Sequence, residues 1–168
     1  MNFALGLAAC LGWISALIHA ALYPRARFWP PKHPTWITVV WSWGLTCAIY
    51  VSIVRLGFTQ GNTLALPALV QNIGIGVAVI GSIYHSWATS ALGVKTTSGW
   101  PLGGTYPAQR CIKGPYRHMS HPQYLGQCLS FIGLALMSGA AQAATIAILG
   151  CAALALASFV EHRHLSKP

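Results

Sequence analysis

The sequence predicts an all-α protein, a polytopic bundle of about five transmembrane helices. Two observations carry this prediction. Charged residues make up 7% of the 168 residues, against roughly 25% in soluble domains, and a soluble domain with so few charges could not cover its surface. Hydrophobic residues make up 55%, and five apolar segments reach or approach the roughly 20 residues that a helix needs to cross the hydrocarbon core.

The five predicted spans follow from the apolar runs and the polar residues between them. The first run has its basic residues after it, unlike a signal peptide, so we expect a retained span. The uncharged turn SGAAQ at 138–142 joins the last two runs into a tight antiparallel hairpin. The fourth run is short and is expected to sit against its neighbours rather than in open lipid. The predicted bounds are 3–22, 36–56, 64–90, 123–139 and 142–161.

A long polar segment rich in glycine and proline, residues 93–121, separates the third span from the fourth. Non-helical chain of this length is tolerated only outside the hydrocarbon or where it lines a cavity. We therefore expect one integral-membrane domain over 1–168, in which a three-span part at 1–90 precedes a loop, a hairpin and a short tail at 91–168.

The basic residues predict the orientation. Nine of the ten lysines and arginines follow the first, third or fifth span, and Arg55 alone lies on the opposite side, near the end of the second span. Cytoplasmic loops are enriched in Lys and Arg, so the N-terminus is predicted outside, with the C-terminus and both long polar loops in the cytoplasm. The net charge of +9 is explained by placement beside anionic membrane lipids, and no basic stripe indicates nucleic-acid binding.

The stretch GPYRHMSHPQYLG at 114–126 gathers an arginine, two histidines, two tyrosines and two prolines at the start of the fourth span. Ser120 can cap this helix, and Pro122 suits the first helical position, where its missing N–H costs nothing. The simplest structural interpretation is a rigid turn at the membrane interface.

Glu161 is the only acidic residue, and it and His121 each lie about twenty residues from the hairpin turn. On adjacent antiparallel helices the two end at the same depth, so we expect Glu161 to face Arg117, His118 and His121. An interfacial pair with Arg163 or Arg117 is an alternative. The helix dipole disfavours an anion at a helix C-terminus by about 0.3–1 kcal/mol, which indicates a cationic partner. A site with one anionic and one cationic end suits a zwitterion such as a free amino-acid group.

The motif carries a resemblance to a known family. GPYRHMSHPQYLG resembles the GPYR-x-x-RHP-x-Y-x-G signature of integral-membrane methyltransferases, among them isoprenylcysteine carboxyl methyltransferases and phospholipid N-methyltransferases. The resemblance covers roughly 91–165 and ends with Glu161 and Leu165, which are similar to that family's E-E-x-x-L end. There are three departures: Ser120 stands where the family has arginine, His162 replaces the second glutamate, and the sequence ends before the family's next segment.

The resemblance implies a methyltransferase that uses S-adenosylmethionine and methylates a small or lipophilic acceptor at the cytoplasmic membrane face. It implies that the cytoplasmic loop and the hairpin form the cofactor pocket, without a metal. The cofactor-binding residues that it implies are Tyr116, Arg117, His121, Tyr124, Gly126 and Glu161.

Methyl transfer from a sulfonium depends on positioning and desolvation rather than on a metal. An anionic acceptor needs no base, whereas an amine must first lose a proton, and His118 and His85 are then the candidate catalytic bases. Because Glu161 is assigned to the cofactor, an acceptor that is already anionic or easily deprotonated is slightly favoured.

Two other functions stay open at this point. One is a non-catalytic membrane subunit or lipid-binding protein of the same fold, which would agree with the three departures. The other is a haem-binding membrane redox protein, in which His19 and His85, near the same ends of the first and third spans, ligate the iron.

Overall fold

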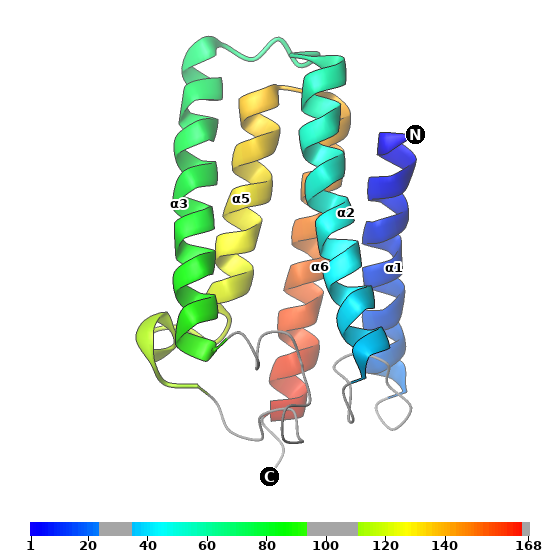
Figure 1. Cartoon of the computed structure of the whole chain (residues 1–168), viewed down its shortest axis with the longest axis vertical. Helices are drawn as coiled ribbons and strands as arrows, with labels where there is room; N and C mark the ends of the chain where they lie inside the picture. Colours follow the sequence, from blue (N-terminus) through cyan, green and yellow to red (C-terminus); the bar gives the residue numbers. More distant parts are fainter. Residues whose placement is uncertain (24–34, 94–110, 166–168) are drawn as a thin grey trace.

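The computed structural model describes residues 1–23, 35–93 and 111–165. Five long helices stand side by side in one bundle (Figure 1), and these residues contain no β-strand, so the predicted all-α fold is confirmed. A short 3₁₀ helix precedes the fourth long helix. The elements are α1 (Asn2–Leu22), α2 (Trp36–Gln60), α3 (Ala68–Leu92), η1 (Gly114–Arg117), α5 (Pro122–Ser138) and α6 (Ala141–Leu165).

Four of the helices, α1, α2, α3 and α6, are long and apolar enough to cross a membrane. The remaining long helix, α5, has 17 residues, which make about 25 Å of helix against a hydrocarbon core of roughly 30 Å. It packs against α2, α3 and α6, as expected for the short span. Large apolar side chains are exposed on the outer faces, for example Ile83 at 66% and Ile148 at 68%. Such surfaces fit lipid rather than water, as expected of an integral membrane protein.

The third span begins later than the sequence predicts, at Ala68 instead of residue 64. The side chain of Asn62 closes a turn there. The Leu66 N–H donates to Asn62 Oδ1 at 2.8 Å, and the Asn62 amide donates to the Leu66 carbonyl at 2.8 Å. Pro67 follows in an extended conformation as the N-cap residue, so helix formation cannot start before it.

The start and the end of α5 define the hairpin. Its N-cap residue is His121, without a side-chain capping bond, so the expected cap by Ser120 is wrong. Pro122 takes the first helical position as predicted. At the other end Gly139 adopts a left-handed conformation with φ of 63°, which suits glycine. Since α6 starts at Ala141, the predicted tight turn is confirmed.

The backbones of α3 and α5 are in direct contact. A Cβ atom on Gly81 would lie 2.5 Å from the Ser130 N atom, and one on Gly126 would lie 2.5 Å from the His85 N atom. The hydroxyls of Ser82 and Ser130 are 3.2 Å apart. Lipid gives helices no hydrophobic reason to associate, so close backbone packing and such polar contacts hold the pair together. The small residues at this contact are Gly74, Ala78, Gly81, Gly126, Ser130 and Gly133.

The last helix, α6, contacts α1, α2 and α5. Toward its C-terminal end, Leu17 and Ala20 of α1 pack with Ala157 and Val160 of α6, and all four residues are buried. The end of α6 and the start of α5 therefore lie at the same end of the bundle, next to η1 (Figure 1). This end carries the candidate site.

Replacing Gly81 tests whether backbone contact holds α5 in place. In Gly81→Ala the new methyl group would lie 2.5 Å from the Ser130 N atom, so we expect a loss of about 1–3 kcal/mol of stability, as at other overpacked sites. Gly76→Ala is the matched control, because nothing lies within 4 Å of a Cβ at Gly76 and alanine favours the helix. Thermal denaturation in detergent should show a lower midpoint for Gly81→Ala alone. Equal midpoints would contradict this packing.

Candidate functional site

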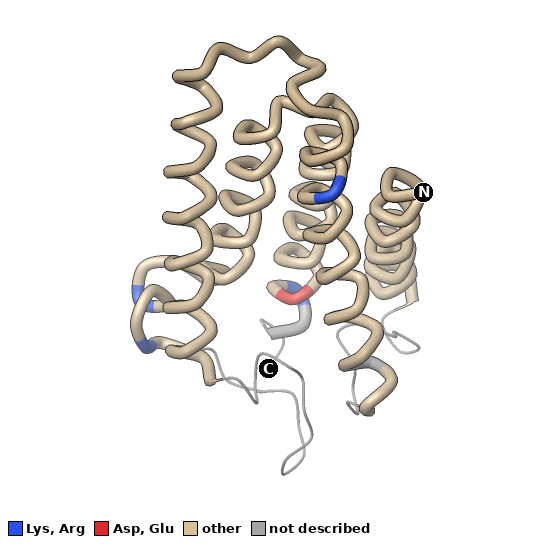
Figure 2. Tube along the Cα trace, turned by 45° about the horizontal axis from the view of Figure 1, so that its top comes forward, with Lys and Arg blue, Asp and Glu red and all other residues tan. Residues whose placement is uncertain are grey.

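Glu161 lies near the C-terminal end of α6 and is 8% exposed. Its Oε2 atom is 3.5 Å from Nδ1 of His121, the residue that precedes α5. The predicted proximity of these two residues is therefore confirmed, because the tight hairpin brings them to the same depth. Figure 2 shows the single acidic position, in red, near the C-terminal end of α6.

Tyr124 contacts the other carboxylate oxygen of Glu161. Its hydroxyl donates to Oε1 at 2.5 Å. His121 and Tyr124 are three residues apart at the start of α5, so their side chains share a face. Their rings are stacked, with 5° between the planes and 5.7 Å between the centroids. Each carboxylate oxygen thus contacts one of these two side chains.

The two ring nitrogens of His121 differ in their surroundings. A carboxylate only accepts hydrogen bonds, so Nδ1 carries a proton where it faces Glu161. Nε2 is buried and has no hydrogen-bond partner among the residues that the structure describes. Leaving a buried polar atom unsatisfied costs about 1–3 kcal/mol, and each such atom in a native structure requires an explanation. The cluster therefore retains one unfilled hydrogen-bonding position.

Tyr116 on η1 belongs to the same electrostatic environment. Burial raises the pKa of its phenol, and Cys111 and the negative charge of Glu161 raise this pKa further. The turn is held close to α3 by Gly114, which has φ of 53° and whose Cβ would lie 2.9 Å from the Ala91 Cβ. The loop motif thus places Tyr116 within electrostatic range of the carboxylate.

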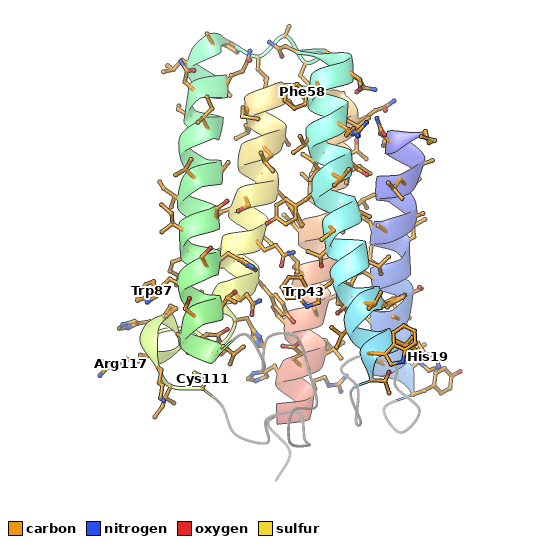
Figure 3. All side chains as sticks on the ribbon, in the orientation of Figure 1. His19, Trp43, Phe58, Trp87, Cys111 and Arg117 are labelled. Atoms are coloured by element: carbon orange, nitrogen blue, oxygen red, sulfur yellow. The ribbon has the colours of Figure 1, made fainter. Side chains whose placement is uncertain are left out.

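Arg117 and His118 do not join this cluster. Both are exposed, and Figure 3 shows Arg117 on the outer side of η1, directed away from the bundle. The expectation that Glu161 faces these two residues is therefore wrong. Consecutive residues of a 3₁₀ helix point in different directions, and burial falls on Tyr116 rather than on Arg117.

Arg163 is the basic residue nearest to Glu161 along the chain. Its guanidinium carbon lies 5.2 Å from the centroid of the Phe159 ring, in a cation–π contact. Glu161 forms an ion pair with His121. The alternative of an interfacial pair between Glu161 and Arg163 stays a prediction.

His85 and Gly126 lie at the contact between α3 and α5. Nδ1 of His85 is 3.1 Å from the Gln123 carbonyl oxygen. A carbonyl only accepts, so Nδ1 donates this bond. Gly126 packs on the backbone of His85. Both residues thereby hold the start of α5, which carries His121 and Tyr124.

His19 and His85 are not arranged as ligands of one haem. His19 is exposed on α1, with its ring 5.2 Å from that of Tyr23. The neighbours of α1 are α2 and α6, whereas those of α3 are α5 and η1, and Figure 1 shows α1 and α3 on opposite sides of the bundle. The haem prediction is therefore wrong, because matched depth along two helices does not bring them together.

A groove of about 340 Å³ lies between the first half of α5 and the second half of α6. His121 and Tyr124 line it, so it is continuous with the Glu161 cluster. Two other lining residues, Leu125 and Ala155, are exposed on the outer surface of the helices. The groove therefore connects the polar cluster with the face of the bundle that meets lipid.

Sequence reasoning missed this groove. The available signal was the spacing of Leu154, Ser158 and Glu161, which are four and three residues apart and so share one face of α6. In an alanine-rich helix that signal is weak, since small residues suit both packing and an open groove. Ala157 is buried in the bundle, for example, whereas Ala155 lines the groove.

The fold and the cluster define an integral membrane protein with a methyltransferase-like motif at one end. A family model described as phospholipid methyltransferase matches residues 70–168, and the chain belongs to this family. A similar curated protein is phosphatidylethanolamine N-methyltransferase B of Dictyostelium discoideum, 29% identical over 108 residues, which are 63% of this chain and 54% of that protein. The match thus spans about half the length of that relative. No solved structure matches the chain significantly.

The family match confirms the resemblance that the motif carries. It favours the phospholipid branch of the membrane methyltransferases, and it supports methyl transfer at a membrane as the general activity.

The electrostatic coupling between Tyr116 and Glu161 can be measured. Glu161→Gln removes the negative charge, so the pKa of Tyr116 should fall relative to the wild-type protein, while burial still keeps it above the ordinary value of about 10. The titration is followed by tyrosinate absorbance in two backgrounds, the wild-type protein and Glu161→Gln. In each background, the difference from a Tyr116→Phe variant isolates the signal of Tyr116. Equal midpoints in the two backgrounds would show that Tyr116 does not sense the carboxylate.

Proposed function

We propose that this protein transfers a methyl group from S-adenosylmethionine to the amine of a phospholipid headgroup at the cytoplasmic membrane face. Family membership supports methyl transfer at a membrane, and a similar protein is named as a phosphatidylethanolamine N-methyltransferase. The observation that carries the proposal is the buried carboxylate of Glu161, held by Tyr124 and His121. An amine acceptor replaces the anionic one that the sequence slightly favoured.

The cluster suits the charges of the proposed cofactor. S-Adenosylmethionine supplies a methyl group on a positively charged sulfur and also carries a free ammonium group. Glu161 is 8% exposed, and its attraction for a cation is strong where water is largely excluded. The helix dipole disfavours an anion at the end of α6 by about 0.3–1 kcal/mol, and a bound cation offsets this cost. Tyr116 and Tyr124 add aromatic surface and hydroxyl groups.

We assign the cofactor to the surroundings of Glu161, with Tyr116, Tyr124 and His121 as its neighbours. Gly126 contributes indirectly, because its lack of a side chain lets α5 approach α3. Arg117 points away from this cluster, and we assign it to contact with anionic headgroups at the membrane surface.

In this function the residues of the chain orient the reactants and exclude water. Methyl transfer requires the reacting atoms to be held close and in line. Tyr124 and His121 fix the carboxylate, and the buried packing of Leu17 on α6 keeps water from one side of the cluster. Because α1 and α2 pack on α6, we propose that 1–90 and 91–168 work as one domain.

We propose that the end of the bundle with the cluster faces the cytoplasm. Lys113 and Arg117 lie beside and within η1, and Arg163 lies near the end of α6, whereas Arg55 lies in the later part of α2. Figure 2 shows the corresponding blue positions, most of them at the end with the red Glu161 position. The excess of basic residues supports this orientation, with the N-terminus outside.

We propose that the groove between α5 and α6 holds the lipophilic part of the acceptor. Its volume of about 340 Å³ lies within the roughly 300–1,000 Å³ of small-molecule sites. Leu125 and Ala155 are exposed to the surroundings of the bundle, so a lipid reaches the groove without leaving the membrane. Its headgroup then lies near His121 and Tyr124.

Labelled S-adenosylmethionine and defined lipids test the proposal. Protein in vesicles should transfer label to phosphatidylethanolamine and not to phosphatidylglycerol, which has no amine. Labelled lipid should form only when S-adenosylmethionine is added on the side of the vesicle membrane where η1 lies. Glu161→Gln should lose about 10- to 100-fold in affinity for S-adenosylmethionine by calorimetry, as expected for a lost hydrogen bond to a charged group.

Arg55→Gln is the control for this experiment, because it changes one charge on a helix that does not carry the cluster; its affinity should match the wild type. Cofactor binding without any labelled lipid would favour the non-catalytic lipid-binding alternative. If neither binding nor transfer occurs, the proposed function is rejected.

Filling the groove tests the route of the acceptor. Ala155→Trp should raise the KM for long-chain phosphatidylethanolamine by about tenfold or more, the scale of steric discrimination in apolar pockets. The affinity for S-adenosylmethionine should change little. Ala152→Trp is the matched control, since Ala152 is exposed on α6 but does not line the groove. An equal KM for both variants would place the acceptor elsewhere.

A further inference from the structure

We propose that Nε2 of His121 accepts the proton that the acceptor's ammonium group loses before methyl transfer, with Glu161 as the positioning residue of this base. The inference rests on the proposed function and deepens it. It replaces His118 and His85, the candidate bases from the sequence, with a histidine that contacts the carboxylate.

The two nitrogens of the His121 ring have separate roles in this arrangement. Nδ1 faces Oε2 of Glu161 at 3.5 Å and so carries a proton, which makes Nε2 the basic nitrogen of the neutral ring. Nε2 is buried and has no hydrogen-bond partner among the residues that the structure describes, and His121 lines the groove between α5 and α6. A lipid amine bound at this part of the groove would lie beside the ring whose Nε2 atom can accept its proton.

The other two histidines lack this combination. Nδ1 of His85 bonds to the Gln123 carbonyl at the packed contact of α3 and α5, and His85 does not line the groove. His118 is exposed on η1, where it exchanges protons with water. Among the histidines that the structure describes, His121 is the one that both faces a carboxylate and lines the groove.

Groups from several elements lie around His121. Oε2 of Glu161 on α6 is 3.5 Å from Nδ1, and Tyr124 on α5 donates to the other oxygen of the same carboxylate. The nearby phenol of Tyr116 on η1 has a raised pKa, so it stays neutral and adds no competing charge. The apolar cluster that contains Leu17 of α1 packs against Tyr124. The carboxylate of Glu161 is therefore placed to pair with the ring once the ring has accepted a proton.

The reaction has two steps, a proton transfer and a methyl transfer, and each proton and electron pair is accounted for. First, the ammonium of the headgroup gives one proton to Nε2, which leaves a neutral amine and an imidazolium paired with Glu161. Second, the nitrogen lone pair forms the new N–CH₃ bond, while the electrons of the broken S–CH₃ bond stay on sulfur. The positive charge thus moves from sulfur to nitrogen, and the imidazolium releases its proton to water afterwards.

The pH dependence of kcat/KM tests this role. Toward acid pH the wild-type rate should fall as the base becomes protonated. His121→Asn, which keeps a polar side chain without a basic nitrogen, should lower the rate at neutral pH by about 10²- to 10⁴-fold and lose that acid limb. His19→Asn, an exposed histidine on α1, is the matched control and should keep the wild-type profile. A His121→Asn enzyme with the wild-type acid limb, or loss of that limb in His85→Asn instead, would overturn the inference.

A binding measurement separates this role from cofactor contact. The affinity for S-adenosylhomocysteine, measured by calorimetry, should change far less in His121→Asn than the rate does. If affinity and rate fall by the same factor, His121 acts only in binding and the base role is rejected. A wild-type protein that methylates no lipid would reject the proposed function itself, which is a different outcome.

A spectroscopic readout needs neither substrate nor activity. In protein with ¹⁵N-labelled histidine rings, neutral His121 should show a protonated Nδ1 and an unprotonated Nε2, with its signals identified by their loss in His121→Asn. Glu161→Gln removes the acceptor that faces Nδ1, so it should change the tautomer of this ring and of no distant histidine. A neutral ring protonated at Nε2 in the wild-type protein would contradict the proposed orientation.

Discussion

The contact of the Glu161 carboxylate with Tyr124 and His121 depends on one constraint, which is that α5 and α6 meet at a fixed depth. The turn at Gly139 allows little slack between the two helices. One helical turn is about 5.4 Å, so a shift of α5 by a single turn would remove both contacts. The polar chemistry of this chain therefore depends on a hairpin whose own residues are almost entirely apolar.

Close packing of α3 against α5 also helps to fix the depth of α5 in the bundle. Where Gly81 and Gly126 bring the two backbones together, the hydrogen bond between His85 and the Gln123 carbonyl ties α3 to the start of α5. In a membrane such packing takes the place of the hydrophobic drive that orders soluble cores. Some residues of the predicted cofactor-binding motif thus also form the contact between α3 and α5, and this contact fixes the position of the motif. Gly126 is the clearest case.

The cluster itself is locally unfavourable. A buried anion at the C-terminal end of a helix opposes the helix dipole, and in the described part of the chain the buried Nε2 atom of His121 has no hydrogen-bond partner. Tyr124 and His121 compensate part of this cost through their contacts with Glu161. What remains is polar chemistry that the fold does not need for its own stability, and it is the basis of the methyl-transfer proposal. The groove beside the cluster opens to the outer surface of α5 and α6 at Leu125 and Ala155.

The amino-acid sequence was sufficient to predict the all-α membrane class, the hairpin and the depth at which Glu161 meets His121. These follow from composition, helix rise and turn position, which are local quantities. The predicted start of α3 was off because the turn closed by the Asn62 side chain depends on individual hydrogen bonds. The arrangement of the folded chain was needed to show that Arg117 points outward, that α1 and α3 lie apart, and that a groove opens beside Tyr124. Packing between segments far apart in the chain decides which way a side chain points around its helix and which helices become neighbours. No local sequence pattern specifies either.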